Sequence, residues 1–233
     1  MKHLIVTEDI NSLPKVRYDR VILDTTTNEI VYQGVNTNGH SYVDLGLPSG
    51  TLWATMNVGA KTETDYGDYF MWGSTTPNTN TPCNWANAPF NNGANDYDEE
   101  YFTTHKSEWL DNNGNLKPEF DAARAIMGGD WRIPTMNEFQ ELIDYTTNEW
   151  TTINGVSGRK FTASNGNSIF IPAPGRRLGS SFEFRGINGY FWSSFLSTGN
   201  LELSMTLFFN SKPGYIYMGG GRRYYGLVVR GVL

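Results

Sequence analysis

Cysteine and histidine are scarce in this chain, and their scarcity excludes several classes of protein. Cys83 is the only cysteine among 233 residues, so the chain has no internal disulfide framework and no cysteine spacing typical of zinc sites. The three histidines, His3, His40 and His105, are too far apart in the sequence to indicate a cluster of metal ligands. The redox compartment stays open.

Basic runs and long apolar runs are also missing. The net charge is −6 and the isoelectric point about 5.1, so the electrostatic footprint of a nucleic-acid-binding protein is absent and we expect no nucleic-acid partner. No window approaches about 18 apolar residues, so we expect no membrane span. The segment 1–9 lacks the apolar core of a secretory signal. A mature chain whose signal had been removed would look the same, so export stays open.

Sequence motifs of common enzymes do not occur. The chain has no Gly-x-Ser-x-Gly, His-Glu-x-x-His or phosphate-binding Gly-Lys-Ser/Thr sequence. Because the chain has 24 acidic residues, some pair of them could always be chosen as the two carboxylates of a glycoside hydrolase. Such a pair indicates nothing unless the distance between the two carboxylates is known. We therefore expect a protein without catalytic activity and without a cofactor.

Two stretches rich in side-chain oxygens are candidates for calcium. Residues 96–100 contain four acids, and residues 111–115 resemble the start of a calcium loop. The second stretch lacks the glycine and the glutamate that such a loop carries at its sixth and twelfth positions. We interpret both stretches as solvated loops, although the sequence does not decide whether calcium binds there.

The residues that are present predict an α+β domain with two helices, short antiparallel strands and long loops. The first helix begins near Pro118 and ends at Gly128, with apolar residues at helical spacing between them. In the second, Thr135 and Glu138 form a capping box, and an apolar stripe continues to Tyr145. Strands are predicted at 160–163 and 168–171, joined by an Asn-Gly turn. The 25 glycines are consistent with many turns.

The first 40 residues are predicted to form a small separate unit. Two short apolar runs, 20–23 and 29–32, are joined by a polar loop of hairpin length. Two strands alone are only marginally stable in water, so this hairpin is expected to pack on the main domain or on another subunit. We predict an attachment or assembly role for residues 1–40 and assign residues 41–233 to the main domain.

The segment 201–210 alternates as a strand with two different faces. One face is predicted to be core and the other to face outward. Phe208 is the only large apolar side chain on the outward face, and it is a candidate contact residue unless a loop covers it. The core face contains Leu201, Leu203, Met205, Leu207 and Phe209, and the outward face contains Glu202, Ser204, Thr206, Phe208 and Asn210.

Several motifs, in order, resemble a large family of gut-bacterial and phage domains. The resemblance covers about residues 42–233. The motifs lie at 43–60 (VDLGLPSGTLWATMNVGA), 66–73 (YGDYFMWG), 128–135 (GGDWRIPT) with Glu138 and Phe139, 167–173 (NSIFIPA), 189–194 (GYFWSS) and 225–230 (YGLVVR).

This resemblance implies a C-type lectin-like fold, in the form shared by formylglycine-generating enzymes and by the variable proteins of diversity-generating retroelements. Those enzymes use a pair of cysteines, which this chain lacks. In the variable proteins a reverse transcriptase rewrites adenine-containing codons near the carboxyl terminus, here about residues 189–233. The sugar-binding calcium motifs of animal lectins are absent, so calcium-dependent sugar binding is not supported.

The resemblance also implies a set of variable, ligand-binding residues after Ser194. Each is a residue type that adenine changes in an Asn or Ser codon give, and each is expected to face solvent, where substitution costs little stability. At every position the alternative is a loop or core residue of a non-variable relative, and this alternative applies most to Tyr224 and Tyr225. The set is Phe195, Ser197, Thr198, Asn200, Thr206, Phe208, Asn210, Tyr215, Tyr217, Gly219, Gly221, Tyr224 and Tyr225.

Two functions are compatible with these features. The first is a ligand-display or receptor-binding protein on a phage virion or a bacterial cell surface, with a diversified carboxyl-terminal face. The second is a non-variable adhesin or structural domain of the same fold. The expected partners are a protein or glycan ligand on a cell surface, and a second copy of the chain or a phage or surface assembly attached through residues 1–40. The sequence does not identify the ligand.

Overall fold

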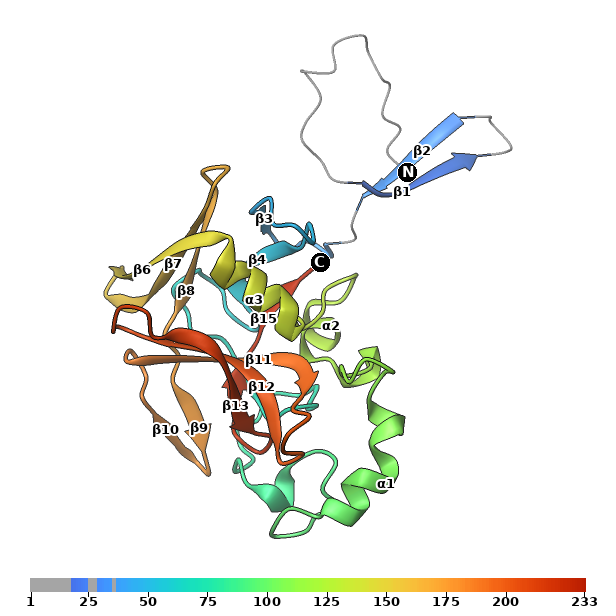
Figure 1. Ribbon diagram of the computed structural model, residues 1–233, viewed down its shortest axis with the longest axis vertical. Coiled ribbons are helices and arrows are strands. Elements are labelled where there is room, and N and C mark those ends of the chain that lie inside the picture. The colour runs from blue at the N-terminus through green and yellow to red at the C-terminus, as the bar shows by residue number, and fades with distance from the viewer. Residues whose placement is uncertain (1–17, 25–28, 35–36) are drawn as a thin grey trace.

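The computed structural model describes residues 18–24, 29–34 and 37–233, with side chains from residue 37 onward, and its secondary structure is α+β as predicted (Figure 1). Strands in small sheets dominate, and the described residues contain three α-helices where the sequence predicted two. The helices are α1 (Glu99–Trp109), α2 (Ala122–Met127) and α3 (Met136–Asp144), with 3-10 turns η1 (Trp85–Asn87) and η2 (Pro118–Phe120).

Most strands are short and pair with antiparallel neighbours. The predicted hairpins at 20–32 and 160–171 are both confirmed, as β1 with β2 and β7 with β8. The strands are β1 (Tyr18–Asp24), β2 (Glu29–Gly34), β3 (Tyr42–Asp44), β4 (Leu52–Asn57), β5 (Tyr69–Phe70), β6 (Thr146–Ile153), β7 (Val156–Ala163), β8 (Ser168–Pro172), β9 (Arg176–Leu178), β10 (Ser181–Glu183), β11 (Asn188–Leu196), β12 (Leu203–Asn210), β13 (Ile216–Arg222), β14 (Leu227–Val228) and β15 (Arg230–Val232).

The largest sheet has five strands in the order β13-β12-β11-β14-β5. Its β11 and β14 run parallel, and the other neighbouring pairs are antiparallel. Separate three-stranded sheets are formed by β15-β4-β3 and by β6-β7-β8. The last strand, β15, pairs with β4, and the backbones of Leu52 and Leu233 exchange hydrogen bonds of 3.1 and 2.9 Å. The beginning and end of the main domain are thereby joined, as Figure 1 shows near β4.

One face of the large sheet is covered by α3. Phe139 and Leu142 of this helix pack in one buried cluster with Phe191, Leu207 and Phe209 of β11 and β12. Burial of large apolar side chains contributes most of the favourable free energy of folding. The inner face of β11–β12 is therefore fixed against a helix.

The predicted helix from Pro118 to Gly128 is divided into two elements. Asp121 interrupts it, with extended backbone angles between η2 and α2. Its buried carboxylate accepts the backbone N–H of Arg124 at 3.0 Å and that of Ile133 at 2.8 Å. Desolvation raises the pKa of Asp121 although these hydrogen bonds oppose the shift. The end of α2 at Gly128, with φ 68°, is as predicted.

Helix α1 was not predicted, and its first residues, Glu99 and Glu100, were interpreted as part of a solvated acidic loop. Asp98 caps the helix by accepting the N–H of Tyr101 at 2.9 Å, and Glu99 and Glu100 lie in its first turn. Carboxylates at this end are favoured by the helix dipole. The apolar pattern was weak because the helix buries only Phe102 and Trp109.

Within residues 18–24, 29–34 and 37–233, no helix has the length and apolar character needed to cross a membrane. The proposed division at residue 40 and the attachment role of the hairpin stay predictions. The part of that segment before residue 18 lies outside the described residues.

The second predicted helix is confirmed as α3, and the carboxylate of Glu138 fixes its start. Glu138 accepts the N–H of Thr135 at 2.8 Å, while its own N–H donates to the Thr135 hydroxyl at 3.2 Å. The same carboxylate accepts the hydroxyl of Thr51 at 2.8 Å and forms an ion pair with Arg132. Arg132 in turn exchanges backbone hydrogen bonds with Val232 of β15. One buried carboxylate therefore links α3, the start of β4 and the last strand.

The charge of Glu138 should make stability depend on pH. Desolvation by itself raises the pKa of the Glu138 carboxyl. The hydrogen bonds and positive charge of Arg132 oppose this effect, as do the hydrogen bonds from Thr135 and Thr51, and the resulting pKa lies below its ordinary value of 4.5. A depressed folded-state pKa gives stability that is present above the unfolded pKa and is lost as the pH falls through the folded one. Glu138→Gln should lower the free energy of unfolding by about 1.5–3 kcal/mol at neutral pH.

Urea unfolding at a series of pH values measures this difference. The difference in unfolding free energy between wild type and Glu138→Gln should have its full value above about pH 5. It should become smaller in more acidic solution, where the wild-type carboxyl becomes protonated. The exposed Glu149 of β6 provides the control, because Glu149→Gln should leave the curve unchanged. A difference between wild type and Glu138→Gln that stays constant into acid would contradict a role for the charge.

Candidate ligand-binding surface

An aromatic row crosses the outward face of β11, β12 and β13. Phe208 of β12 lies opposite Tyr190 of β11 and Tyr217 of β13 in the strand register. Its ring centroid is 5.0 Å from that of Tyr190 and 5.1 Å from that of Tyr217. Cross-strand aromatic pairs of this kind stabilise a sheet and hold the rings in place. Tyr190, Phe208 and Tyr217 are called the aromatic row below.

The alternation predicted for β12 holds in its second half. Leu207 and Phe209 are fully buried on the inner face, while Phe208 is half-buried among the tyrosines and lines a pocket. Leu203 and Met205 are only half-buried, and Leu201 precedes the strand. The inner face is therefore core mainly at Leu207 and Phe209.

In the first half of β12 the prediction of an exposed outward face is wrong. Ser204 is fully buried and donates its hydroxyl to the carbonyl of Phe195 at 2.7 Å. Thr206 is 3% exposed and donates to the carbonyl of Gly219 at 3.2 Å. The register of β11 shifts between Trp192 and Leu196, and the buried Trp192 lies on this side of the sheet. Thr206 pairs with Trp192 before this shift and lines the same pocket as Phe208, so it keeps its outward direction and is buried beside the Trp192 ring. Periodicity alone does not reveal such cover.

A pocket of about 270 Å³ opens beside the aromatic row. Arg176 of β9 forms part of its wall, with its guanidinium 4.5 Å from the centre of the Tyr225 ring and 6.0 Å from that of Tyr190. Glu183 of β10 accepts from Arg176 at 2.8 Å and holds it there. The lining residues are Arg176, Tyr190, Thr206, Phe208, Tyr217, Gly219, Gly220, Gly221, Tyr225 and Leu227.

The pocket combines aromatic rings, one cation and polar donors. Desolvation raises the pKa of Tyr190, so its phenol stays neutral, and the hydroxyl accepts from the Asn188 amide at 3.0 Å. The ring edges and faces supply contact area, and Arg176 supplies positive charge next to them. These groups are suited to binding a ligand, and none of them forms a nucleophile with a neighbouring base.

The thirteen predicted ligand-binding positions divide by exposure. Thr198, Asn200, Tyr215 and Tyr217 are exposed. Thr206 and Gly221 are buried, so the expectation that all thirteen face solvent is wrong for these two. The half-buried positions are Phe195, Ser197, Phe208, Asn210, Gly219, Tyr224 and Tyr225.

The same positions also divide by location. The pocket brings together six of the predicted residues. Phe195, Ser197, Thr198 and Asn200 lie instead at the end of β11 and in the turn that follows it. Asn210 ends β12, and Tyr215 precedes β13, so both lie at the opposite hairpin end. The six in the pocket are Thr206, Phe208, Tyr217, Gly219, Gly221 and Tyr225.

The two tyrosines after β13 follow a buried arginine, Arg223. Arg223 lies 3.9 Å from the centre of the Phe102 ring and donates to the carbonyl of Leu201 at 2.9 Å. Desolvation lowers the pKa of this guanidinium to about 10, which still leaves it charged at neutral pH. Tyr224 then packs on Trp85 at 5.0 Å and on Tyr225 at 4.9 Å. Tyr224 is therefore a packing residue of the turn more than a free contact.

Sequence reasoning missed Arg176 and Tyr190. Arg176 lies outside the segment that the resemblance marks as variable, and only the folded hairpin brings it to the pocket. Tyr190 belongs to the 189–194 motif, which precedes the predicted ligand-binding set. In the sequence, the only indication that Tyr190 takes part in the site is the alternation of β11, which places Tyr190 and Trp192 on the same face of the strand.

Other candidate chemistry is weak. Cys83 is fully buried, and desolvation raises the pKa of its thiol to about 11, so it stays an unreactive neutral thiol. Within the described part of the chain, no three His, Cys, Asp or Glu residues form a group that could hold a metal ion. In the 111–115 loop the Asp111 carboxylate is occupied by the N–H groups of Asn113 and Asn115, both at 2.9 Å.

Comparisons with known proteins add no assignment. No family model, no curated protein and no solved structure matches the chain.

Substitution at Gly221 should separate frame from surface. A Cβ at this position would lie 2.9 Å from the Thr206 methyl and 3.2 Å from the Trp192 ring. Gly221→Tyr should therefore lower the free energy of unfolding by about 1–3 kcal/mol through overpacking. Tyr215→Ser, at a side chain 49% exposed, should change it by less than about 0.5 kcal/mol. Thermal and urea unfolding measure both, and equal stability of the two variants would return Gly221 to the replaceable set.

Proposed function

We propose that the protein is a non-catalytic ligand-display protein that binds a receptor through the outward face of β11–β13. The observation that carries the proposal is the aromatic row beside Arg176, held on a sheet whose inner face is buried against α3. An exposed set of rings around a pocket is typical of a binding site. The ligand is a protein or glycan on a cell surface.

The fold that we propose is C-type lectin-like, of the kind shared with formylglycine-generating enzymes. Support comes from the ordered motifs between residues 43 and 230 and from the α+β organisation. The single cysteine gives no support to the enzymatic branch of this family.

We further propose that retroelement mutagenesis diversifies the carboxyl-terminal surface. Substitution is tolerated where side chains leave the frame undisturbed. Tyr217 at 48% exposure and Phe208 meet this condition, whereas the buried Thr206 and Gly221 do not and are removed from the proposed variable set. Arg176 and Tyr190 are proposed as constant contacts at the edge of the variable surface.

The binding physics would resemble that of an antibody paratope. Tyr and Phe offer large, stiff contact area at low entropic cost, and Ser, Asn and Gly adapt to different ligands. Most of the binding energy would come from a few aromatic anchors, with Phe208 and Tyr217 foremost. We place the protein on a phage virion or a bacterial surface, where several copies joined through residues 1–40 would raise a weak affinity by avidity.

The alternative is a fixed adhesin or structural domain of the same fold. The ion pair of Arg176 with Glu183 favours it, because both residues lie outside the variable segment and would suit one constant ligand. Both functions use the same surface if the fixed domain is an adhesin. A purely architectural domain would not need the aromatic row.

Removal of two rings tests the binding role. Phe208→Ala combined with Tyr217→Ala should weaken binding of labelled protein to a panel of bacterial cells and glycans by more than about 30-fold, since each anchor is worth about 2 kcal/mol or more. The double variant should lose no more than about 2 kcal/mol of unfolding free energy, because the lost contacts are cross-strand pairs.

Tyr145 provides a matched control. Its ring is exposed at the end of α3, behind the sheet, and Tyr145→Ala should leave binding unchanged. Retained binding by the folded double variant would remove the aromatic row from the proposed site and favour an architectural domain.

A further inference from the structure

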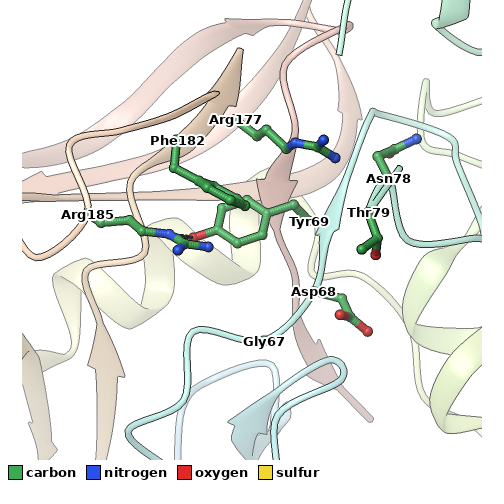
Figure 2. A pocket seen from close by; sticks show the side chains of 8 residues that line it. All are labelled: Gly67, Asp68, Tyr69, Asn78, Thr79, Arg177, Phe182 and Arg185. Carbon is green, nitrogen blue, oxygen red and sulfur yellow. Dashed lines mark hydrogen bonds between the residues drawn. The ribbon is translucent and has the colours of Figure 1, made fainter. Parts of the chain in front are cut away.

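A second pocket lies on the other side of the β9–β10 hairpin. Successive residues of a strand point to opposite faces, so Arg176 faces the aromatic row while Arg177 faces away from it. The pocket has a volume of about 260 Å³ and shares no lining residue with the first. Figure 2 shows its lining residues, which are Gly67, Asp68, Tyr69, Asn78, Thr79, Arg177, Phe182 and Arg185.

Arg177 is a buried cation without a carboxylate in the fold. Its side chain reaches toward Asn78 (Figure 2), and the residue is only 6% exposed. Among residues 37–233, Nε and Nη1 have no hydrogen-bond acceptor, and no acid forms an ion pair with the guanidinium. Two backbone hydrogen bonds with Gly226, of 2.7 and 2.9 Å, keep it in place. The guanidinium carbon lies 5.7 Å from the centre of the Phe182 ring. A buried charge without a hydrogen-bonded counter-ion is costly, and buried polar atoms without a partner call for an explanation such as a bound ligand.

Arg185 brings a second guanidinium to the same pocket. Its plane lies 3.4 Å from the centre of the Phe182 ring, and its Nε donates to the Tyr69 hydroxyl at 3.0 Å. That hydroxyl donates to the carbonyl of Pro174 at 2.5 Å, so a backbone group fixes Tyr69 and Tyr69 in turn fixes Arg185. The two Nη nitrogens have no acceptor within the described part of the chain. The Arg185 side chain is therefore already in position before a ligand binds, and its two Nη nitrogens are available to a ligand.

The charges of the pocket leave a surplus of one positive unit. Asp68 is the acid among the lining residues, and it forms no ion pair with any described residue. In Figure 2 its carboxylate lies apart from both guanidinium groups. Desolvation raises the pKa of Asp68, as expected for a carboxyl that no cation stabilises. Two guanidinium groups and one carboxylate match a ligand group that carries a single negative charge.

We infer that this pocket binds the carboxylate of a small ligand, with Arg177 and Arg185 as its two cationic groups. Guanidinium forks match the planar geometry of a carboxylate and hydrogen-bond it bidentately. Phe182 is 47% exposed, and the exposed part of its ring receives the apolar part of the ligand. Thr79 is exposed at the rim and offers a hydroxyl to a polar substituent. The site is independent of the diversified surface, because none of its residues lies after residue 185.

Titration with small carboxylates tests the inference. D-glucuronate and N-acetyl-L-alanine each present one carboxylate, on a sugar and on an amino acid, and D-glucose and N-acetyl-L-alaninamide are their neutral counterparts. Calorimetry on the full chain should show saturable binding of at least one carboxylate, with its neutral counterpart at least tenfold weaker. The carboxylate that binds more tightly shows whether the ligand is a sugar acid or an amino-acid derivative. Binding of neither carboxylate, equal binding of a neutral counterpart, or tighter binding of inorganic sulfate would overturn the inference.

Substitution assigns the binding to this pocket. Arg185→Gln, at a residue on the surface, should weaken the carboxylate at least tenfold while the chain stays folded. Arg177→Gln should do the same where it folds, as judged by circular dichroism. Arg222→Gln is the matched control, because Arg222 is exposed and lines neither pocket. Unchanged affinity in Arg185→Gln, or an equal loss in Arg222→Gln, would place the carboxylate elsewhere.

Discussion

The buried carboxylate of Glu138 is the interaction on which the arrangement of the domain depends. It caps α3 through Thr135, accepts from Thr51 at the start of β4, and pairs with Arg132, whose backbone bonds to β15. The backbone of Ser194 also donates to the carbonyl of Pro134 at 2.9 Å, which links β11 to the start of the same helix. A buried acid is tolerated because every oxygen has a donor and the charge has a cation.

From this anchor the two faces of the large sheet acquire different roles. Phe139 and Leu142 of the anchored helix fill the inner face together with Phe209, so the strands cannot shift without opening the core. The outer face then carries its aromatic row on a fixed backbone, so a ligand at the proposed surface would meet rings that are already placed. Preorganised contacts of this type lose little entropy on binding. The β9–β10 hairpin adds one arginine to each of two pockets by simple alternation.

The sequence predicted those features that depend on neighbouring residues. The capping box of α3, the Asn165-Gly166 hairpin and the inward position of Leu207 are local patterns, and all three are confirmed. Helix α1 was missed because its apolar pattern is weak, although Asp98 marked its start. The burial of Thr206 and Gly221 depends on their contact with Trp192 of the neighbouring strand, and both pockets depend on the β9–β10 hairpin meeting segments that follow or precede it in the sequence. Long-range pairing of this kind cannot be derived from periodicity.

The central claim is that a constant frame carries a replaceable surface, and sequence variation across natural populations tests it most directly. Codons 189–233 would be sequenced from many independent copies of this gene. The account predicts substitutions at adenine-containing codons that concentrate at outward positions such as Phe208 and Tyr217, with Phe191, Leu207 and Phe209 constant. A segment that never varies, or one that varies equally at the inward positions, would contradict it.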